Sequence, residues 1–296
     1  MVEAKLYIKL AMAPVLWGGA LVAGRVISAQ LPPFTTAFVR FLLAGMFMMP
    51  VLHRREGSFP RPARQETVMI LLLSITGVVC FNFFLFSGLQ TVEAGRSAVI
   101  IALTPAVVVL FSRLAVQESL GVRVILGVTA AIAGALVTIT DGNIAVIVSR
   151  APDPGDLWIL AAVFSWALYT LIGKRAMGRL SALAVLTYSF LAGTVMLLPF
   201  ALSEGALHRV PELPVSSWIS LLYLSFGSAG IAYLWYYEGI RHAGPSRASV
   251  FMNLEPAAAV IFGALLLGES ITGSLVTGTI LVLGGVYLAV KKPDPS

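Results

Sequence analysis

The stretch "ALTPAVVVLFSRLAVQES" occupies residues 102–119, and "NLEPAAAVIFGALLLGES" occupies residues 253–270. Each is an apolar run with a proline at its fourth position and a Glu-Ser pair at its end. The two runs align without a gap, 151 residues apart. Runs this apolar predict helices buried in a lipid bilayer, and their recurrence predicts a duplicated unit.

The resemblance between the two halves continues beyond these runs. The 151-residue offset holds from Gly88 onward, and an offset of 149 holds earlier in each half, where Trp17 matches Trp166. Because the duplicated unit includes the first apolar segment, we expect that segment to be retained, although its basic start and the "ISA" at 27–29 resemble a cleavable signal peptide. The predicted organisation is a first repeat at residues 1–140, a linker at 141–155 and a second repeat at 156–296.

The composition is that of a membrane protein. The chain of 296 residues is 58% hydrophobic and only 11% charged, whereas a soluble domain is about a quarter charged. The mean hydropathy of +0.91 agrees with this class. The single cysteine, Cys80, lies in an apolar run, which excludes a disulfide framework. The sequence contains no Cys/His cluster of the kind that binds metal, so neither a metal nor a cofactor is expected.

Ten apolar segments are long enough to cross a bilayer, which takes roughly 20 helical residues. They are residues 6–28, 34–52, 67–90, 95–117, 120–140, 156–177, 181–202, 216–239, 245–267 and 271–290. The predicted fold is therefore an all-α integral membrane protein with ten transmembrane helices. Five crossings per repeat are an odd number, so the second repeat enters the membrane upside down. Such an inverted repeat is common among secondary transporters.

Lysine and arginine residues are distributed unevenly between the two sides of the predicted bundle. With the N-terminus inside, four lie outside (Arg25, Arg96, Arg150 and Arg209), Arg40 lies within a helix, and fifteen lie inside: Lys5, Lys9, Arg54, Arg55, Arg61, Arg64, Arg113, Arg123, Lys174, Arg175, Arg179, Arg241, Arg247, Lys291 and Lys292. An excess of basic residues marks the cytoplasmic side, so both termini are expected in the cytoplasm. Topology accounts for the net charge of +6, and no nucleic-acid partner is expected.

Two copies of a five-helix unit, each ending in a "P…F…E-S…G…G" pattern, resemble the EamA-type members of the drug/metabolite transporter superfamily. The likeness is carried by "VLWGGALVAGR" at 15–25, "FVRFLLAG" at 38–45 and "LEPAAAVIFGALLLGES" at 254–270, and it covers essentially the whole chain. The resemblance implies a multi-pass protein of the bacterial inner membrane that exports metabolites or drugs. The aromatic enrichment is similar to that of the aromatic amino-acid exporters of that family. The partners then expected are a small-molecule substrate and the lipid bilayer, with the protein as a monomer.

Aromatic and polar residues recur at mid-depth of the predicted helices, where a lipid-facing surface has little use for Asn or Tyr. We expect such residues to line a central cavity, with aromatic faces for stacking and hydroxyls for orientation. The alternative is a belt of aromatics at the membrane interface, which suits Trp158 and Trp218 at helix starts better than Trp17 and Trp166. The predicted cavity lining consists of Trp17, Asn82, Phe86, Trp166, Tyr169, Tyr233 and Tyr237.

Three further residues are candidates for substrate contact. Glu255 lies about ten residues into the ninth predicted helix, and an ionisable group at such depth is a functional candidate. It either carries a proton or braces helix packing through a hydrogen bond. Asn253 lies two residues earlier and is expected to be buried. Arg40, in the second predicted helix, either receives a substrate carboxylate, extends to the headgroups or pairs internally.

Prolines and acids mark the opening stretches. Pro105 and Pro256 are expected to break their helices and to free the carbonyls four residues earlier, which provides either a hinge beside the transport path or a kink that shapes packing. Glu118 and Glu269 each precede a serine able to cap the next helix. We interpret both acids as structural turn residues.

The sequence favours a secondary exporter of small metabolites, above all amino acids including aromatic ones, that works by alternating access. No nucleotide-binding loop of the form G-x-x-x-x-G-K-[ST] is present, so ATP is not the direct energy source. The alternatives are proton-driven drug efflux, nucleotide-sugar exchange and a passive channel. An enzyme is not expected, because His53, His208 and His242 lie in or beside loops and no G-x-S-x-G or H-E-x-x-H motif occurs.

Overall fold

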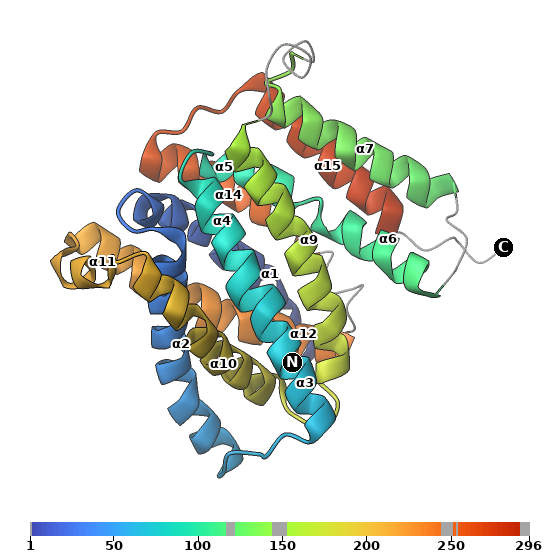
Figure 1. Ribbon diagram of the computed structural model, residues 1–296. Helices are drawn as coiled ribbons and strands as arrows, with labels where there is room; N and C mark the ends of the chain where they lie inside the picture. Colours follow the sequence, from blue (N-terminus) through green and yellow to red (C-terminus); the bar gives the residue numbers. More distant parts are fainter. Residues whose placement is uncertain (1, 117–121, 144–152, 244–250, 253, 291–296) are drawn as a thin grey trace.

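The computed structural model describes residues 2–116, 122–143, 153–243, 251–252 and 254–290. Within these ranges every regular element is a helix, which confirms the predicted all-α fold class for the described part of the chain. The elements are α1 (Val2–Ser28), α2 (Pro33–Glu56), α3 (Arg64–Leu73), η1 (Ser74–Cys80), α4 (Phe81–Leu89), α5 (Ala94–Ile101), α6 (Thr104–Val116), α7 (Val122–Ile139), α9 (Pro154–Ala176), α10 (Ala182–Ser203), η2 (Leu207–Glu212), α11 (Val215–Leu222), η3 (Tyr223–Ala232), α12 (Tyr233–Ala243), α14 (Leu254–Leu267) and α15 (Gly273–Val290) (Figure 1).

Six helices are long and apolar enough to cross a membrane: Leu6–Ser28, Pro33–Glu56, Arg64–Leu89, Pro154–Gly173, Ala182–Ser203 and Val215–His242. Four shorter apolar helices are Ala94–Val108, Ile125–Ile139, Leu254–Leu267 and Gly273–Leu288. These shorter helices fall on the four remaining predicted spans. The 14 residues of α14 extend roughly 21 Å, against about 30 Å of hydrocarbon. The described residues therefore support six full crossings, and the predicted count of ten is not established.

The two prolines of the opening stretches lie at helix breaks, as predicted. Helix α5 ends at Ile101, and α6 begins at Thr104, so that Pro105 stands in the first turn, where its missing N–H is harmless. The carbonyl oxygen of Ile101 accepts a hydrogen bond from the Thr104 hydroxyl at 2.6 Å. In the second half, the carbonyl oxygen of Met252 accepts the backbone N–H of Glu255 at 3.0 Å. Local donors thus satisfy the carbonyls at both breaks.

Elements of the two halves begin at corresponding positions. The π-helices η1 and η3 start at Ser74 and Tyr223, which are 149 residues apart. Helices α7 and α15 carry glycines at matching positions, Gly127 and Gly134 in the first and Gly278 and Gly285 in the second. A π-helix is rare and is frequently found at a functional site. Its occurrence at matching places in both halves therefore directs attention to the segments around it.

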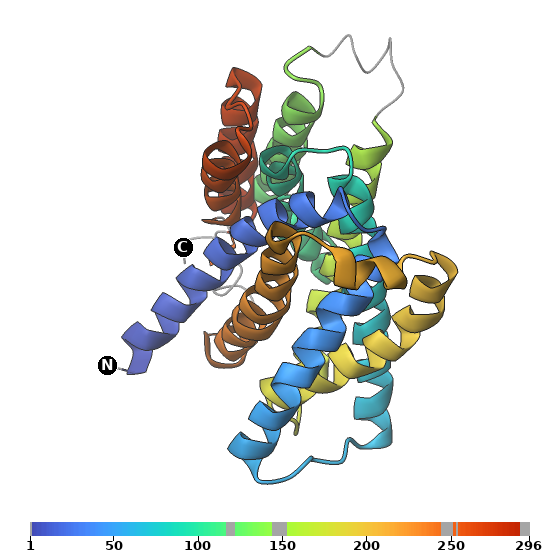
Figure 2. The same cartoon turned by 90° about the vertical axis from the view of Figure 1, so that its left-hand side faces the viewer.

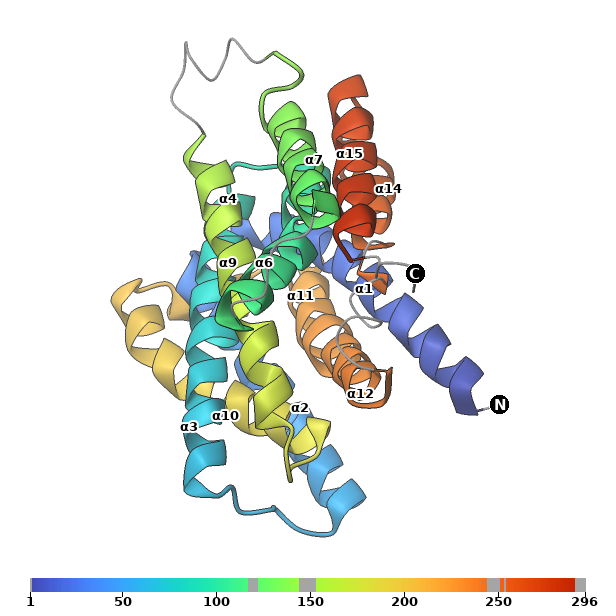
Figure 3. The ribbon, with the colours of Figure 1, turned by 90° about the vertical axis from the view of Figure 1, so that its right-hand side faces the viewer.

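Helices α7 and α15 lie side by side, as Figures 1 and 3 both show. A Cβ atom on Gly134 would lie 2.7 Å from the carbonyl oxygen of Gly278, and one on Gly285 would lie 2.5 Å from that of Gly127. Only glycine permits backbones to approach this closely. The repeated glycines therefore serve the packing of these two helices against each other.

The rest of the bundle is built around α1 and α9. Helix α1 packs against α14, α12 and η3, and α9 packs against α4, α5 and α6. Figure 2 shows the N-terminal end of α1 projecting from the bundle, whereas the rest of the helix lies among the other helices. Aromatic side chains, among them Tyr169, Tyr233, Tyr236 and Tyr237, are the largest fully buried groups. An aromatic core therefore occupies the middle of the molecule.

Candidate functional site

A small cavity lies within this aromatic core. It is lined from α1 by Trp17, Ala20 and Leu21, from α2 by Arg40, from α4 by Phe81 and Leu85, from α5 by Ile101, from α9 by Trp166, from η3 by Leu224 and Ser228, from α12 by Tyr233, and by Met252 and Glu255 beside the second helix break. Its volume is about 40 Å³, room for roughly three water molecules. Pockets for drug-sized ligands measure about 300–1,000 Å³. A metabolite therefore needs the surrounding side chains to move apart.

Three aromatic rings meet edge to face at this cavity. The centroid of Trp17 lies 5.6 Å from that of Trp166 and 5.6 Å from that of Tyr233, and Trp166 and Tyr233 are 5.2 Å apart. Their interplanar angles lie between 81° and 84°. Edge-to-face pairs of this kind stabilise by about 0.5–1.5 kcal/mol beyond their buried area. Trp17 and Trp166, which occupy matching places in the sequence, are thus in direct contact.

The polar atoms of these three rings have no partner. In the described part of the chain, the indole nitrogens of Trp17 and Trp166 and the hydroxyl of Tyr233 are buried and form no hydrogen bond. Buried donors are nearly always satisfied by protein or by ordered water. Three unsatisfied donors around one cavity indicate a place for a polar ligand or for water.

Arg40 also faces the cavity. Its side chain is buried, with 2% exposed, so it does not extend to the headgroups. It donates to Asn82 Oδ1 at 2.6 Å, to the carbonyl oxygen of Leu224 at 3.2 Å and to Ser228 Oγ at 2.9 Å. All three acceptors are neutral, and the ion pairs found in the described residues involve other groups. Three roles are expected for Arg40 from the sequence: binding a substrate carboxylate, extending to the headgroups and pairing internally. The burial of its side chain excludes extension to the headgroups.

Asn82 positions Arg40. Its side-chain amide donates to the carbonyl oxygens of Gly77 and Val78 in η1, at 2.9 and 3.1 Å. These bonds use its N–H groups and leave Oδ1 facing the guanidinium. The carbonyl oxygen of Leu224, in η3, holds the same guanidinium from the other half of the chain. Both π-helices therefore take part in orienting Arg40.

Glu255 is the second residue of α14 and lines the cavity with 6% of its surface exposed. Within the described residues its carboxyl group forms neither a hydrogen bond nor an ion pair. Helix α1 approaches closely here, because a Cβ on Gly18 would lie 2.9 Å from the carbonyl oxygen of Glu255. One alternative from the sequence is that Glu255 stabilises helix packing through a hydrogen bond. In the described part of the chain, its carboxyl group forms no such bond.

The structure brings five predicted site residues together around the cavity: Trp17, Arg40, Trp166, Tyr233 and Glu255. Four others lie behind them. Asn82 holds Arg40, the ring of Phe86 lies 5.8 Å from the Arg40 guanidinium carbon, and Tyr169 packs 5.1 Å from Trp166 and 5.7 Å from Tyr237. Asn253 lies outside the described residues.

Sequence reasoning missed several lining residues. Leu224 and Ser228 lie in the π-helix η3, where the 3.6-residue periodicity does not hold. Sequence reasoning also missed Tyr236, which does not line the cavity but packs against Trp17, with 5.1 Å between the ring centroids. The run of aromatics at 233–237 was a usable signal for this residue.

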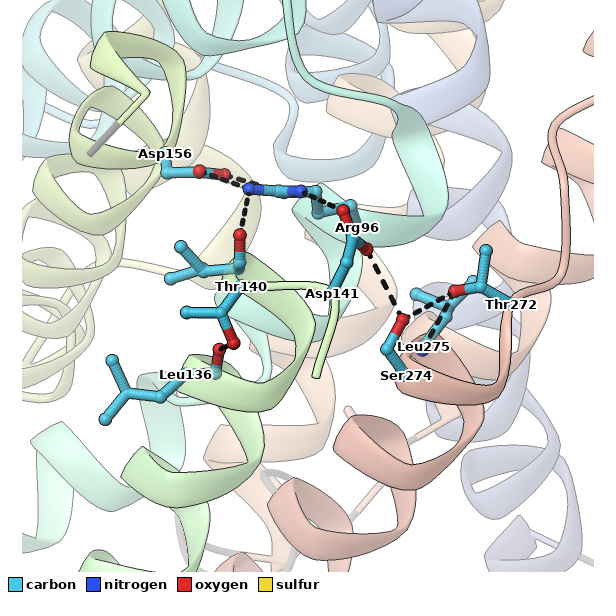
Figure 4. A network of polar contacts seen from close by, with 9 residues as sticks. Arg96, Leu136, Thr140, Asp141, Asp156, Thr272, Ser274 and Leu275 are labelled. Carbon is cyan, nitrogen blue, oxygen red and sulfur yellow. Dashed lines mark hydrogen bonds and ion pairs between the residues drawn. The ribbon is translucent and has the colours of Figure 1, made fainter. Parts of the chain in front are cut away.

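A second polar cluster lies at the end of the bundle where α5 and α15 begin (Figure 4). Arg96 on α5 donates to both carboxylate oxygens of Asp156 on α9, at 3.0 and 2.5 Å, and to the carbonyl oxygen of Ile139 at 2.6 Å. Its third nitrogen lies 3.5 Å from Asp141 Oδ2, and Asp141 in turn accepts from Ser274 at 3.3 Å. Figure 4 shows Arg96 reaching between the two aspartates. A cavity of about 320 Å³ opens beside this cluster.

Two glutamates cap helices of the other half at the same end. Glu269 accepts the backbone N–H groups of Ala94 and Gly95 at 2.8 and 3.0 Å, and Glu204 accepts those of Phe34 and Thr35 at 3.0 and 2.7 Å. A carboxylate at a helix N-terminus satisfies free donors and complements the dipole. Glu269 is therefore structural, as expected, but it stabilises α5 rather than its own turn. Glu118 lies outside the described residues.

At the opposite end, other contacts join the halves. Lys9 and Arg55 pair with Glu238 at 2.8 and 3.4 Å. The hydroxyl of Ser181 donates to Glu56, and Tyr188 donates to the carbonyl oxygen of Pro60 at 2.7 Å. The central cavity thus lies between two sets of contacts that link the first half of the chain to the second.

Comparison with known proteins agrees with this architecture. The model of the EamA-like transporter family matches twice, at residues 5–140 and 153–291. The chain is 28% identical to the uncharacterized transporter YyaM of Bacillus subtilis (strain 168), over 96% of this chain and 93% of that one. It is 25% identical to the uncharacterized inner membrane transporter YicL of Salmonella typhimurium, over 94% of this chain and 92% of that one.

A solved crystal structure shares the fold, with a TM-score of 0.62 and 20% identity over 95% of this chain and 94% of that one. The family and the named relatives are transporters rather than enzymes. Together with the apolar helices described above, the match over nearly the whole length shows that this chain is a multi-pass membrane transporter and belongs to the EamA-like transporter family.

Proposed function

We propose that the protein is a secondary transporter that exports small metabolites, chiefly amino acids including aromatic ones, through the central cavity. The observation that carries the proposal is the cavity itself: a space inside a membrane transporter, walled by Trp17, Trp166 and Tyr233 with unsatisfied donors and bordered by one buried cation and one buried carboxyl group. Aromatic walls suit an apolar side chain, and the charged groups suit an amino-acid backbone.

We further propose that the chain forms two inverted five-helix repeats, residues 1–140 and 156–296, and works as a monomer in the bacterial inner membrane. The matching starts of η1 and η3 and the matching glycines of α7 and α15 support the duplication. The excess of basic residues on one side supports cytoplasmic termini. With this orientation, the end that carries Arg96 and Asp156 faces outward, and the end that carries Lys9 and Glu238 faces the cytoplasm.

In this proposal the two sets of contacts at the ends open in turn. Opening the outer end requires separation of Arg96 from Asp156 and of Glu269 from α5. Opening the inner end requires separation of Lys9 and Arg55 from Glu238. The helix breaks before Thr104 and Leu254 lie beside the cavity and supply points at which α5, α6 and α14 can bend.

Glu255 favours one variant of this function, in which export is coupled to protons. A carboxyl group without a counter-ion is most stable in its neutral form in a water-poor site, and a group that can change protonation there can carry a proton. Proton-driven drug efflux is the corresponding alternative. Nucleotide-sugar exchange has less support, because Arg40 is the one cation that lines the cavity among the described residues.

The test is uptake into liposomes that contain the purified protein. A panel of labelled amino acids, cationic drugs and nucleotide sugars is offered with and without a pH gradient. Saturable uptake of amino acids that is stimulated by the same amino acid on the other side supports the proposal. Transport of drugs or nucleotide sugars but of no amino acid contradicts it, and flux that neither saturates nor shows counter-stimulation indicates a channel.

A further inference from the structure

The central cavity is bordered by two ionisable groups of opposite type, a guanidinium and a carboxyl group, that do not pair with each other. Arg40 from α2 and Glu255 from α14 both line it, with 2% and 6% of their surfaces exposed. Among the described residues, neither pairs with the other or with a third charged group. A buried ion without a counter-charge is costly. The arrangement therefore suits a ligand that brings a negative group to one residue and a positive group to the other.

The geometry of Arg40 leaves part of its guanidinium available. A guanidinium carries five N–H donors, and three of them are used by Asn82, Leu224 and Ser228. Because these acceptors are neutral, they fix the direction of the group without cancelling its charge. Two donors and the full positive charge remain for a carboxylate, which an arginine recognises well.

Glu255 has the complementary property. Its carboxyl oxygens have no donor among the described residues, and it borders the cavity from the opposite half of the chain. An ammonium group supplies up to three donors, and its positive charge favours the ionised form of this otherwise neutral carboxyl group. The corresponding residue of the first half, Thr104, uses its hydroxyl on the carbonyl oxygen of Ile101. Among the described residues, the carboxyl group therefore borders the cavity from one half of the chain, which gives a bound ligand one orientation.

The aromatic rings connect the two charged groups. Tyr233 is near enough to Arg40 and to Glu255 to interact electrostatically with both. Trp17 and Trp166 pack on Tyr233 at centroid distances of 5.6 and 5.2 Å. Any ligand held by both charged groups therefore lies against these rings.

We propose that Arg40 binds the carboxylate and Glu255 the ammonium of a zwitterionic amino acid, and that this pair of contacts makes the cavity selective for ligands that carry both charges. The proposal rests on the proposed function and adds the recognition rule. Amines that lack a carboxylate leave the buried charge of Arg40 unpaired, and acids that lack an ammonium group leave the carboxyl group of Glu255 without a partner, so both classes are discriminated against.

Calorimetric binding to the purified full-length protein tests this rule. The probes are L-phenylalanine, phenethylamine, L-phenylalanine methyl ester and 3-phenylpropionate, with L-leucine, isoamylamine and 4-methylpentanoate as an aliphatic series. We expect each amino acid to bind roughly 10- to 100-fold more tightly than its analogues, since a hydrogen-bonded ionic contact is lost in each. Equal affinity of the amino acids and their one-charge analogues overturns the rule while leaving amino-acid export standing. Failure of every amino acid to bind overturns both.

Variants assign the two ends of the ligand. Arg40→Gln is expected to weaken L-phenylalanine binding roughly 10- to 100-fold and to leave phenethylamine binding unchanged, and Arg40→Lys is expected to recover part of the loss. Glu255→Gln is expected to weaken L-phenylalanine and to spare 3-phenylpropionate. Arg209→Gln, which removes an exposed arginine of η2 that does not line the cavity, is the matched control and is expected to leave the affinity ratio of amino acid to amine unaltered. If Arg40→Gln lowers the affinities of both ligands equally, Arg40 is a structural residue and the assignment is wrong. If a variant does not fold, the wild-type analogue series decides.

Discussion

The indole rings of Trp17 and Trp166 meet edge to face, with 5.6 Å between their centroids and 81° between their planes. The two residues occupy matching positions 149 residues apart, one on α1 and the other on α9. Their contact places equivalent residues of the two halves at one wall of the cavity. A movement of the halves against each other must therefore change this contact.

Trp17→Ala and Trp166→Ala are each expected to reduce transport several-fold, because an aromatic pair contributes about 0.5–1.5 kcal/mol beyond its buried area. Phenylalanine at either position keeps a ring and is expected to retain more activity. The measurement is initial uptake in liposomes at equal protein content, with melting temperature recorded in parallel. Trp158→Ala, a change at a partly exposed tryptophan, serves as the control. Wild-type transport by both alanine variants would show that other residues form the functional wall.

Glu255→Gln separates proton coupling from helix packing, because glutamine keeps the shape of the side chain but cannot titrate. Tyr233 and Tyr236 from α12 and Arg40 from α2 are the titratable or charged groups near it. If Glu255 carries the coupling proton, the variant loses accumulation driven by a pH gradient, while exchange at saturating substrate continues. If Glu255 serves packing, Gln is nearly silent and Glu255→Leu lowers the melting temperature. Accumulation against a gradient by the Gln variant eliminates coupling through this residue.

Arg96→Gln is expected to destabilise the protein by on the order of 3 kcal/mol, because it leaves the carboxylate of Asp156 buried without its partner. Asp156 is 1% exposed, and the lost contact is the two-point pair shown in Figure 4. Thermal melting in detergent measures the effect. The double variant Arg96→Gln with Asp156→Asn removes both charges and is expected to recover much of the loss. If the double variant loses as much stability as the two single variants together, loss of the ion pair is not the cause of the destabilisation.

The orientation is tested by cysteine labelling. In a background with Cys80→Ser, Pro60→Cys is expected to be protected from an impermeant reagent added to intact cells, whereas Arg209→Cys is expected to react. The basis is the excess of lysine and arginine on the side that carries residue 60. The opposite labelling pattern would reverse the proposed inside and outside.

Glu93 gives the protein a specific dependence on pH. The Glu93 side chain is largely exposed, but desolvation by the surrounding residues raises the pKa of its carboxyl above the ordinary 4.5, and the neighbouring Glu269 raises it further. The folded state therefore binds the proton more tightly than the unfolded state, so stability falls as pH rises above about 4.5 through the raised pKa. Glu93→Gln is expected to melt at a higher temperature than the wild type at pH 7 and at the same temperature at pH 4.

The control for this prediction is Glu212→Gln, a change at an exposed carboxylate of the 3-10 helix η2. It is expected to leave the difference between pH 4 and pH 7 unchanged. A Glu93→Gln variant with the same pH profile as the wild type would show that the cost of this charge is negligible.

Much of the architecture follows from hydropathy and repetition. Apolar runs of helical length specify where the helices lie, because only a helix satisfies its own backbone within lipid. The two prolines mark the breaks before Thr104 and Leu254, because proline removes a backbone donor wherever it stands. Matching residues identified Trp17 and Trp166 as a pair, and the structure places them in contact.

The contacts that make the site depend on segments far apart in the chain. Arg40 is held by Asn82 and by Ser228, which is 188 residues away, and Glu269 caps a helix start 175 residues away. No local pattern predicts such partners. The π-helices η1 and η3 also change which side chains share a helix face, so the 3.6-residue periodicity of an α-helix does not hold there. That periodicity therefore does not predict that Leu224 and Ser228 line the cavity, or that Asn82 lies behind Arg40. Which residues of an apolar helix face lipid, a neighbouring helix or the cavity is settled only when the helices pack, because all three environments accept the same side chains.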